Sequence, residues 1–270
     1  MRTKIITLLL AIIADTNITF AATKIGDFFY TNFDAENKEV TLTKSPNKYE
    51  DLTIANIPAT VVYNGVTYNV AYIDEDAFHS SKIETVTIPN SVISIGLRAF
   101  YGCSNLTDID IPNSVTYIGL KVCQSCSSLK SARVGHGVTS IKTSMFSQCP
   151  ELEKVTIGNN IQNIDMNAFN ECTNLKQFIN YSETPASVNR YAFSYCNITQ
   201  CTLYVPRNSI DLYKNADKWC EFYKIEAIED VQAIDDVAAD KVQGVKVIRD
   251  GKVYLQKGEK TYTMQGQEVK

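Results

Sequence analysis

The amino-acid sequence predicts a β-rich repeat solenoid, a right-handed coil whose turns form a ladder of parallel strands, with a small β cap at each end. The first observation is a period of 23 residues that three classes of position share. The classes are Cys103, Cys126, Cys149 and Cys172; Phe100, Cys123, Phe146 and Phe169; and Ile95, Ile118, Ile141 and Ile164. The second is the spacing inside a unit, where Ile109 and Ile111 alternate as in a half-buried strand that Pro112 then ends. Each unit is therefore one coil, which buries its apolar face only against neighbouring coils.

Residues 1–22 have the plan of a secretory signal peptide. Arg2 and Lys4 precede an apolar run from Ile5 to Ala14, and a polar stretch then ends in small residues, with cleavage expected near Ala21 or Ala22. The run is too short for a bilayer, which needs about 20 residues. The signal peptide predicts that the chain is exported, and no other segment of the sequence is expected to cross a membrane.

Residues 23–70 are expected to form a strand-rich N-terminal cap. Asn64-Gly65 lies between two apolar, β-branched runs and is the strongest short signal for a β-hairpin. An uncovered solenoid end would expose apolar coil faces and strand edges, so a cap is needed there.

Residues 71–206 are expected to hold about six repeats. The unit from Ile93 to Val115 reads ISIGLRAFYGCSNLTDIDIPNSV. Written as IPNSV-x-x-IG-x-x-AF-x-x-C-x-x-L-x-x-I-x-IP, the pattern resembles the BspA-type leucine-rich repeat family of bacterial secreted and cell-surface proteins. The resemblance implies a leucine-rich-repeat solenoid. The chain departs from the pattern at Val122-Cys123, which replaces Ala-Phe, and at Gly135-His136-Gly137, which replaces the Pro-Asn-Ser turn.

Three segments follow the repeats. Residues 207–226 are expected to be a C-terminal capping helix segment with Trp219 and Phe222 in its core. Residues 227–243 have the acidic, small-residue composition of a linker, and residues 244–270 the short strands and turns of a β tail. The tail is similar to C-terminal tails of secreted proteins from anaerobes, which resemble shortened sorting domains of type IX secretion. An accessory β module and a sorting or anchoring role both remain open for it.

The eight cysteines of an exported chain invite a disulfide framework. Five of them share one repeat position, and equivalent positions of a solenoid stack inward, so we expect a ladder of buried, reduced thiols. The ladder is Cys103, Cys126, Cys149, Cys172 and Cys196. Cys201 and Cys220 lie outside it and are the best disulfide candidates.

The sequence predicts no enzyme, no catalytic residue, no metal site and no cofactor. Only His79 and His136 could serve a nucleophilic triad, and both are expected to be turn residues. Cys123 and Cys126 have CxxC spacing without a second pair. The acidic cluster from Asp74 to Asp76 lacks the alternating ligands of a calcium loop.

The outward positions of the long strands are the candidate binding surface. They are expected to be Thr85, Thr87, Asp108, Asp110, Ser131, Arg133, Lys154, Thr156, Gln177 and Ile179. A formal charge of −4 disfavours nucleic acid as a partner. The family resemblance implies an extracellular or cell-surface, adhesin-like protein that binds a protein or glycan on host or bacterial surfaces. The alternative is a structural spacer or envelope module whose C-terminal tail mediates anchoring or sorting.

Overall fold

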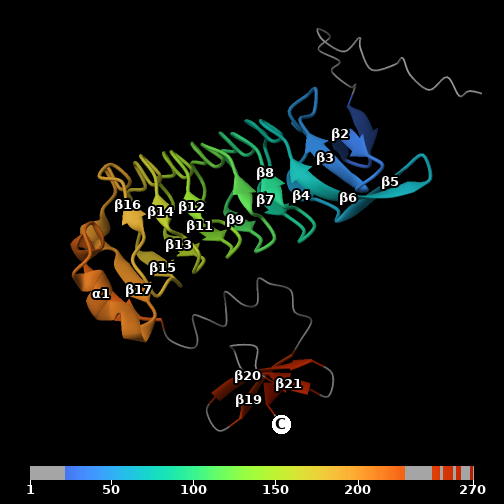
Figure 1. Cartoon of the computed structure of the whole chain (residues 1–270). Helices are drawn as coiled ribbons and strands as arrows, with labels where there is room; N and C mark the ends of the chain where they lie inside the picture. The colour runs from blue at the N-terminus through green and yellow to red at the C-terminus, as the bar shows by residue number, and fades with distance from the viewer. Residues whose placement is uncertain (1–21, 229–244, 250–251, 258–259, 263–267, 270) are drawn as a thin grey trace, which may run out of the picture.

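The computed structural model describes residues 22–228, 245–249, 252–257, 260–262 and 268–269. The predicted signal peptide, up to residue 21, and residues 229–243 of the predicted linker lie outside these ranges. The described repeats stand one behind another in a single row, which confirms the predicted solenoid (Figure 1). In the part of the chain described, no helix is long and apolar enough to cross a membrane.

One side of each coil is a long strand, and these strands pair in parallel. The strands are β4 (Ile54–Asn56), β7 (Thr85–Thr87), β9 (Asp108–Ile111), β11 (Ser131–Val134), β13 (Lys154–Ile157), β15 (Gln177–Asn180), β17 (Thr202–Val205) and β18 (Lys224–Ala227). β9 to β18 form one six-stranded parallel sheet, and β4 pairs with β7 beside it. Asp108 lies opposite Ser131, which lies opposite Lys154, so the register repeats at the predicted period. Since successive residues of a strand point to opposite faces, each coil contributes matching positions to the interior and the surface.

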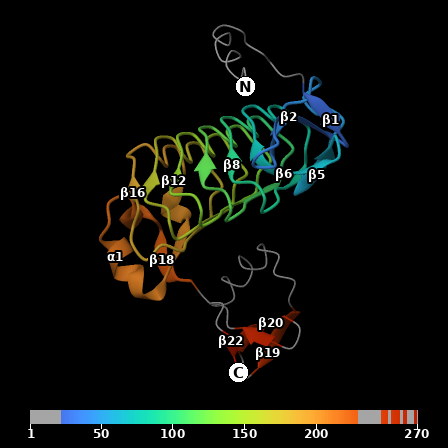
Figure 2. The same cartoon turned by 45° about the vertical axis from the view of Figure 1, so that its right-hand side comes forward.

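The other side of each coil is a two-residue strand, and these strands also pair in parallel. They are β8 (Ser94–Ile95), β10 (Tyr117–Ile118), β12 (Ser140–Ile141), β14 (Asn163–Ile164) and β16 (Ser187–Val188). β8 and β10 extend the sheet of the N-terminal cap, and β12 to β16 form a separate three-stranded sheet. Figure 2 shows β8, β12 and β16 along the same side of the row. Gly119 is needed here because coils approach closely: a Cβ on it would lie 2.5 Å from the Leu97 amide nitrogen.

An arc between the short and long strands joins successive coils by backbone hydrogen bonds. Phe78 N–H donates to the Ala99 carbonyl at 2.7 Å, and Phe100 N–H donates to the Val122 carbonyl at 2.9 Å. Two positions of the arc recur with a positive φ. The first row is Asp76, Arg98, Lys121, Ser144 and Asn167, and the second is Ser80, Gly102, Ser125, Gln148, Glu171 and Tyr195. The stacked coils therefore hold residues other than glycine in a backbone conformation that favours glycine.

Aromatic rings and thiols fill the interior of the arc. Phe169 stacks on Phe146 at 5.6 Å and on Phe193 at 5.3 Å between ring centroids. Cys123 interrupts this stack, and Val122 of the same coil and Met145 of the next stand where the other coils have alanine; all three side chains are fully buried. The smaller residue and the two larger ones lie in adjacent coils, so the larger side chains offset the lost volume of the ring.

The ladder thiols hydrogen-bond to the backbone of the preceding coil. Cys103 Sγ donates to the Phe78 carbonyl at 3.0 Å, and Cys126 Sγ to the Phe100 carbonyl at 3.1 Å. Cys149 and Cys172 make equivalent bonds at 3.2 and 3.1 Å, and Cys196 donates instead to the carbonyl of Cys172 at 3.1 Å. Burial raises the pKa of the Cys196 thiol to about 12. Several of these carbonyls also accept a backbone amide of their own turn, such as Phe78 from Ser81 at 3.0 Å. The thiols thus add a second hydrogen bond to these carbonyls, which have two lone pairs each.

Cys201 and Cys220 do not form the disulfide for which they were the best candidates. All eight cysteines are free thiols. Cys201 is buried and Cys220 is exposed, so the two side chains lie in different environments. The last coil holds Cys201 inward beside the core, where it packs as a small apolar group.

The N-terminal cap is a mixed sheet, mostly antiparallel, that continues into the short strands. Its strands are β1 (Thr23–Ile25), β2 (Phe28–Asp34), β3 (Glu39–Thr43), β5 (Thr60–Tyr63) and β6 (Val66–Ile73). β5 and β6 form the expected hairpin, and Asn64 and Gly65 both have the positive φ that its turn requires. β3 pairs in parallel with β6, which pairs with β8 and so joins the cap to the first coils.

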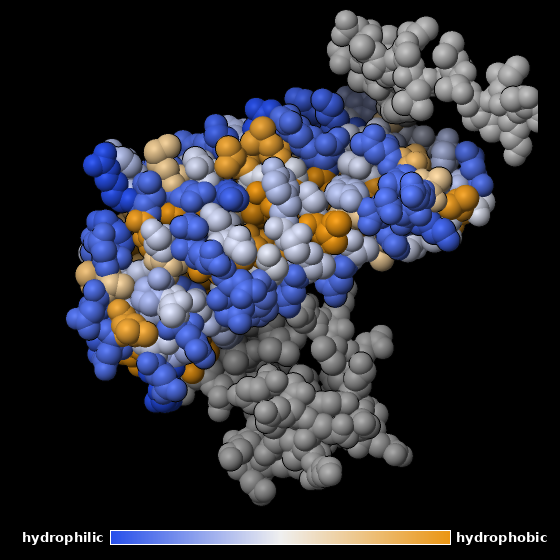
Figure 3. Space-filling model, in the orientation of Figure 1, coloured by the Kyte–Doolittle hydropathy of each residue, from blue (hydrophilic) through white to orange (hydrophobic). Residues whose placement is uncertain are grey.

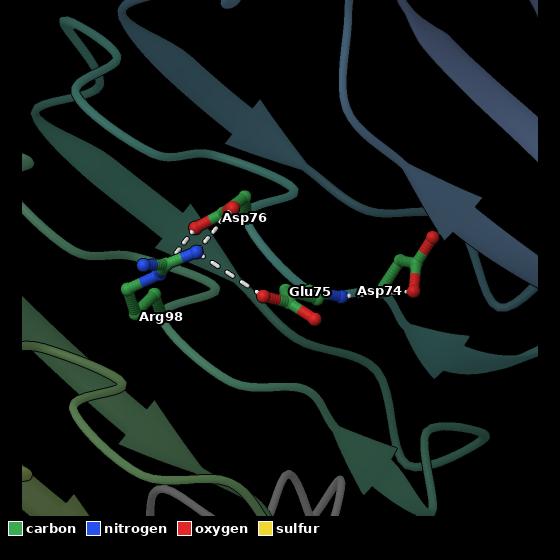
Figure 4. A network of polar contacts seen from close by, with 4 residues as sticks. All are labelled: Asp74, Glu75, Asp76 and Arg98. Carbon is green, nitrogen blue, oxygen red and sulfur yellow. Dashed lines mark hydrogen bonds and ion pairs between the residues drawn. The ribbon is translucent and has the colours of Figure 1, made fainter.

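An ion-pair network also ties the cap and the first two coils together (Figure 4). Arg98 donates to both carboxylate oxygens of Asp76 at 2.9 Å and to Glu75 at 3.1 Å. Thr43 of the cap donates to Asp74 at 3.0 Å. The hydrogen bonds and charges of Asp76, and then of Glu75, raise the pKa of Arg98. The acidic cluster therefore serves inter-coil contacts.

The C-terminal cap closes the last coil with α1 (Ile210–Lys214) and three 3₁₀ turns, η1 (Ile198–Gln200), η2 (Arg207–Ser209) and η3 (Trp219–Glu221). Trp219 and Phe222 are buried, as predicted. Trp219 Nε1 donates to the Ala186 carbonyl at 2.8 Å, and Tyr213 donates to the Ser182 carbonyl at 3.0 Å. Both rings thus carry a polar atom that finds a backbone partner in the preceding coil.

The C-terminal tail contains four strands in an antiparallel order. They are β19 (Val245–Arg249), β20 (Lys252–Lys257), β21 (Lys260–Tyr262) and β22 (Glu268–Val269). Each pairs with the next, and none pairs with a strand of the solenoid among the described residues.

Candidate binding surface

The outward positions of the long strands form two parallel rows, which we call the strand face. The first row is Ile54, Thr85, Asp108, Ser131, Lys154, Gln177, Thr202 and Lys224, and the second is Asn56, Thr87, Asp110, Arg133, Thr156, Ile179, Tyr204 and Glu226. The ten residues expected from the sequence all lie in these rows. Thr85, Thr87 and Asp108 are exposed, and Asp110, Ser131, Arg133, Lys154 and Gln177 are half-buried.

Thr156 and Ile179 are buried, so the exposure expected for them was wrong. Thr156 is 3% exposed and Ile179 is fully buried. In the second row they lie between the longer side chains of Arg133 and Tyr204. A short side chain between two long ones loses its access to solvent. The alternation of inward and outward residues along a strand does not predict this loss, because it depends on the neighbouring strands.

Hydrogen bonds between neighbouring strands hold several charged groups of the strand face in place. Arg133 donates to Asp110 at 2.7 Å and to the Asn113 side-chain oxygen at 3.2 Å. The Arg133 side chain is only 13% exposed, whereas that of Asp110 is 41% exposed. Ser131 donates to Asp108 across the same pair of strands. These donors and acceptors therefore have fixed positions before any partner arrives.

Charge changes sign along the strand face. Asp108 and Asp110 lie on β9, Arg133 on β11 and Lys154 on β13, one strand apart each time. A flanking ion pair joins Lys176 to Glu153 at 2.8 Å, and Lys176 holds the pKa of the Glu153 carboxyl below its usual range. The surface thus has an acidic side toward the N-terminal coils and a basic side toward the C-terminal coils.

Two small hollows accompany the strands. One of about 250 Å³ has Val86, Ile109 and Ala132 among its lining residues, with the charged groups of β9, β11 and β13 around them. The other, of about 410 Å³, is lined by polar residues such as Asn105, Thr107 and Ser128. Cavities for whole small molecules usually measure about 300–1,000 Å³. Hollows at or below the lower part of that range fit single side chains of a larger partner.

Polar and apolar residues alternate over the visible surface. In Figure 3 the apolar residues form separate islands among polar ones. Among the exposed large apolar residues are Ile54 at the N-terminal end of the strand face and Tyr117 on the short-strand side. A surface of this kind suits a polar or mixed contact that includes water.

The remaining candidate groups have structural partners. His79 stacks on Tyr101 at 5.1 Å, and His136 Nδ1 lies 2.7 Å from the Asn159 side-chain oxygen. Cys123 and Cys126 are fully buried. Within the described ranges, His, Cys, Asp and Glu side chains form no group of three able to hold a metal ion.

The outer members of the rows were not predicted from the sequence. Ile54 and Asn56 were assigned to the cap, and Lys224 and Glu226 to a helical segment. Their strands, β4 and β18, pair in parallel with the neighbouring rungs. The only available signal was a short apolar alternation, which the shifted spacing at each end of the array obscures.

Comparisons with known proteins place the chain in a family. The family model described as a BspA type leucine rich repeat region matches six copies, at residues 61–176 and 177–248. A leucine-rich repeat protein from Eubacterium ventriosum is similar in structure, with a TM-score of 0.50 and 23% identity over 71% of this chain and 45% of that one. This chain therefore spans less than half the length of the Eubacterium protein.

Two further solved structures show weaker likeness. A leucine rich cell surface protein from Faecalibacterium prausnitzii has a TM-score of 0.45 and 20% identity, over 76% of this chain and 72% of that one. The T. pallidum leucine rich repeat protein has a TM-score of 0.49 and 21% identity, over 62% of this chain and 85% of that one. No curated protein matches the chain.

Proposed function

Because the chain belongs to the BspA-type leucine-rich repeat family, we propose that it is an exported binding protein, extracellular or at the cell surface, that recognises a partner with its strand face. The partner is a protein or glycan on host or bacterial surfaces, and the role is adhesin-like. The observation that carries the proposal is the anchored Arg133, held between Asp110 and Asn113. Groups fixed before contact lose little side-chain entropy on binding.

Charge variants of the strand face test this function. The full chain is screened against immobilised matrix proteins, glycans and bacterial cells, and binding is then measured for Asp108→Lys and Lys154→Glu. Both side chains reach solvent at the strand face, so we expect each reversal to weaken binding by about tenfold or more. Lys142→Glu is the matched control, because Lys142 follows β12 on the short-strand side. Equal binding by all three variants would exclude the strand face as the binding site.

A spacer or envelope module is the second candidate function. Its support is the tail, whose strands β19 to β22 form a sheet separate from the solenoid sheets. Deleting residues 244–270 distinguishes the two functions in cells. Loss of surface retention with unchanged binding assigns anchoring or sorting to the tail and recognition to the repeats.

We also propose that the chain performs no catalysis. His79 lies in the arc of the first coil and His136 in a turn two coils later, each with a neighbouring side chain as its partner. A nucleophile–base pair needs a serine or cysteine within hydrogen-bond reach of such a histidine. If a hydrolase activity were found, its loss in both His79→Ala and His136→Ala would overturn this proposal.

A further inference from the structure

β18, the last of the long strands, has a free edge among the described residues. Among the described strands, β18 pairs with β17 alone, and the register runs from Thr202 opposite Lys224 to Val205 opposite Ala227. The edge strand of a sheet carries backbone donors and acceptors that a further strand can bind. β18 is therefore the place where the ladder can accept another rung.

The side chains of β18 are less buried than those at the equivalent positions of the preceding long strands. The inward position at the centre of each strand is at most 3% exposed in Ile109, Ala132, Val155, Phe178 and Leu203. The equivalent Ile225 is only half-buried. At the same end of the molecule Tyr223 is 69% exposed and Leu212 is 54% exposed. Ile225 thus occupies a position that the preceding coils bury against a successor, and Tyr223 and Leu212 add exposed apolar surface at the same end.

The charges of β18 are self-complementary. Lys224 and Glu226 flank Ile225 on the outward face and form an ion pair 2.5 Å long within the strand. If a second β18 lies antiparallel with Ile225 opposite Ile225, Lys224 of each copy lies opposite Glu226 of the other. Opposite charges at directly facing positions stabilise a strand pair, and this two-fold arrangement provides two such pairs.

We propose that two copies of this chain associate end to end through antiparallel pairing of their β18 strands about a two-fold axis at Ile225. The joined ladders form one continuous sheet with parallel pairing inside each copy and antiparallel pairing at the junction. The contact is four residues long, so the dimer is weak in solution and is favoured by crowding on a surface. A dimer presents two strand faces to a partner that carries repeated sites.

Reciprocal charge variants of the full chain test this pairing. Sedimentation velocity over a range of concentrations is expected to show a monomer–dimer equilibrium. Lys224→Glu and Glu226→Lys each place like charges opposite one another, and each is expected to raise the dimer dissociation constant by about tenfold or more. An equimolar mixture of the two variants restores both opposite-charge pairs, so it is expected to regain the parental association. Lys82→Glu, an exposed charge change elsewhere, is the matched control.

Other outcomes overturn the proposal. A parent chain that stays monomeric at all concentrations removes the dimer. Single variants that associate as strongly as the parent, or a mixture that stays as weak as its components, exclude β18 as the contact. Growth beyond the dimer indicates head-to-tail stacking of β18 on the β4 end, a different contact. Thermal melting followed by circular dichroism identifies any variant that has unfolded. If either variant is unfolded, the mixing experiment is repeated with Lys224→Asp and Glu226→Arg, which place the same charges at the two positions.

Discussion

Raising the pH above 9 is expected to unfold the protein, because its interior contains buried thiols that stay protonated. Burial raises the pKa of six thiols, those of Cys103, Cys123, Cys149, Cys172, Cys196 and Cys201. In the unfolded chain the same groups ionise near the ordinary value of 9.0. Below that pH both states are protonated and the thiols contribute no pH dependence. Above it the unfolded state binds fewer protons than the folded state, so stability falls as pH rises.

The size of the effect follows from the number of thiols. Between pH 8 and 10, ionisation of one thiol with a pKa near 9 stabilises the unfolded chain by about 1.4 kcal/mol. Six such thiols give about 8 kcal/mol, which is comparable to the whole free energy of unfolding of a typical domain, about 5–15 kcal/mol. The buried tyrosines act in the same direction at higher pH, since burial raises the pKa of Tyr49 to about 12.

The assay is urea denaturation in reducing buffer at pH 8, 9 and 10, followed by circular dichroism. Cys149→Ala removes one ladder thiol and is expected to reduce the pH dependence by about one sixth. Cys220→Ser is the control, because that side chain is exposed in the folded protein, and it should keep the parental slope. A free energy of unfolding that changes by less than about 1 kcal/mol between pH 8 and 10 would refute the buried, protonated thiol ladder.

Further substitutions test the packing of the coils by denaturant unfolding. Phe169→Ala removes a ring stacked on both neighbouring coils and should cost about 3–5 kcal/mol. Gly137→Ala should be at least as severe, because its Cβ would lie 2.3 Å from the Val115 carbonyl oxygen. Lys121 has φ 57°, so Lys121→Gly should be neutral or stabilising by up to about 0.5 kcal/mol, whereas Lys121→Val should cost about 1 kcal/mol. Arg98→Met should lower stability only slightly, and the loss should shrink in high salt, since its ion pairs are exposed to solvent.

The interior of the solenoid was predictable because two periods coincide in the sequence. Residues such as Ile109 and Ile111 alternate as a strand requires, and the same positions return one coil later. A position that is apolar in every coil is expected to face the interior, so the thiol ladder could be predicted from the spacing alone. The hairpin at Asn64 and Gly65 was predictable for a different reason, since few residues other than asparagine and glycine accept a positive φ at both turn positions.

The features that the sequence did not predict depend on neighbours in other coils. Thr156 and Ile179 occupy outward positions, but the lengths of Arg133 and Tyr204 beside them decide their burial. The positive φ of residues such as Lys121 arises from the path of the arc, and the residue types at these positions give no sign of it in the sequence. The end rung β18 was missed because its four residues lack the turn and cysteine that identify the other units.

Gly135, one of the departures from the repeat pattern, directly follows β11 of the proposed binding surface. Gly135 replaces proline at a point where a Cβ would lie 2.6 Å from the Asn113 side-chain oxygen. That oxygen accepts hydrogen bonds from the His136 amide at 2.9 Å and from Arg133 at 3.2 Å. A side chain at position 135 would displace Asn113 and with it one of the two anchors of Arg133. Gly135 therefore leaves the space that Asn113 needs in order to hold Arg133. The same departure from the repeat pattern thus permits the fixed charge of the strand face.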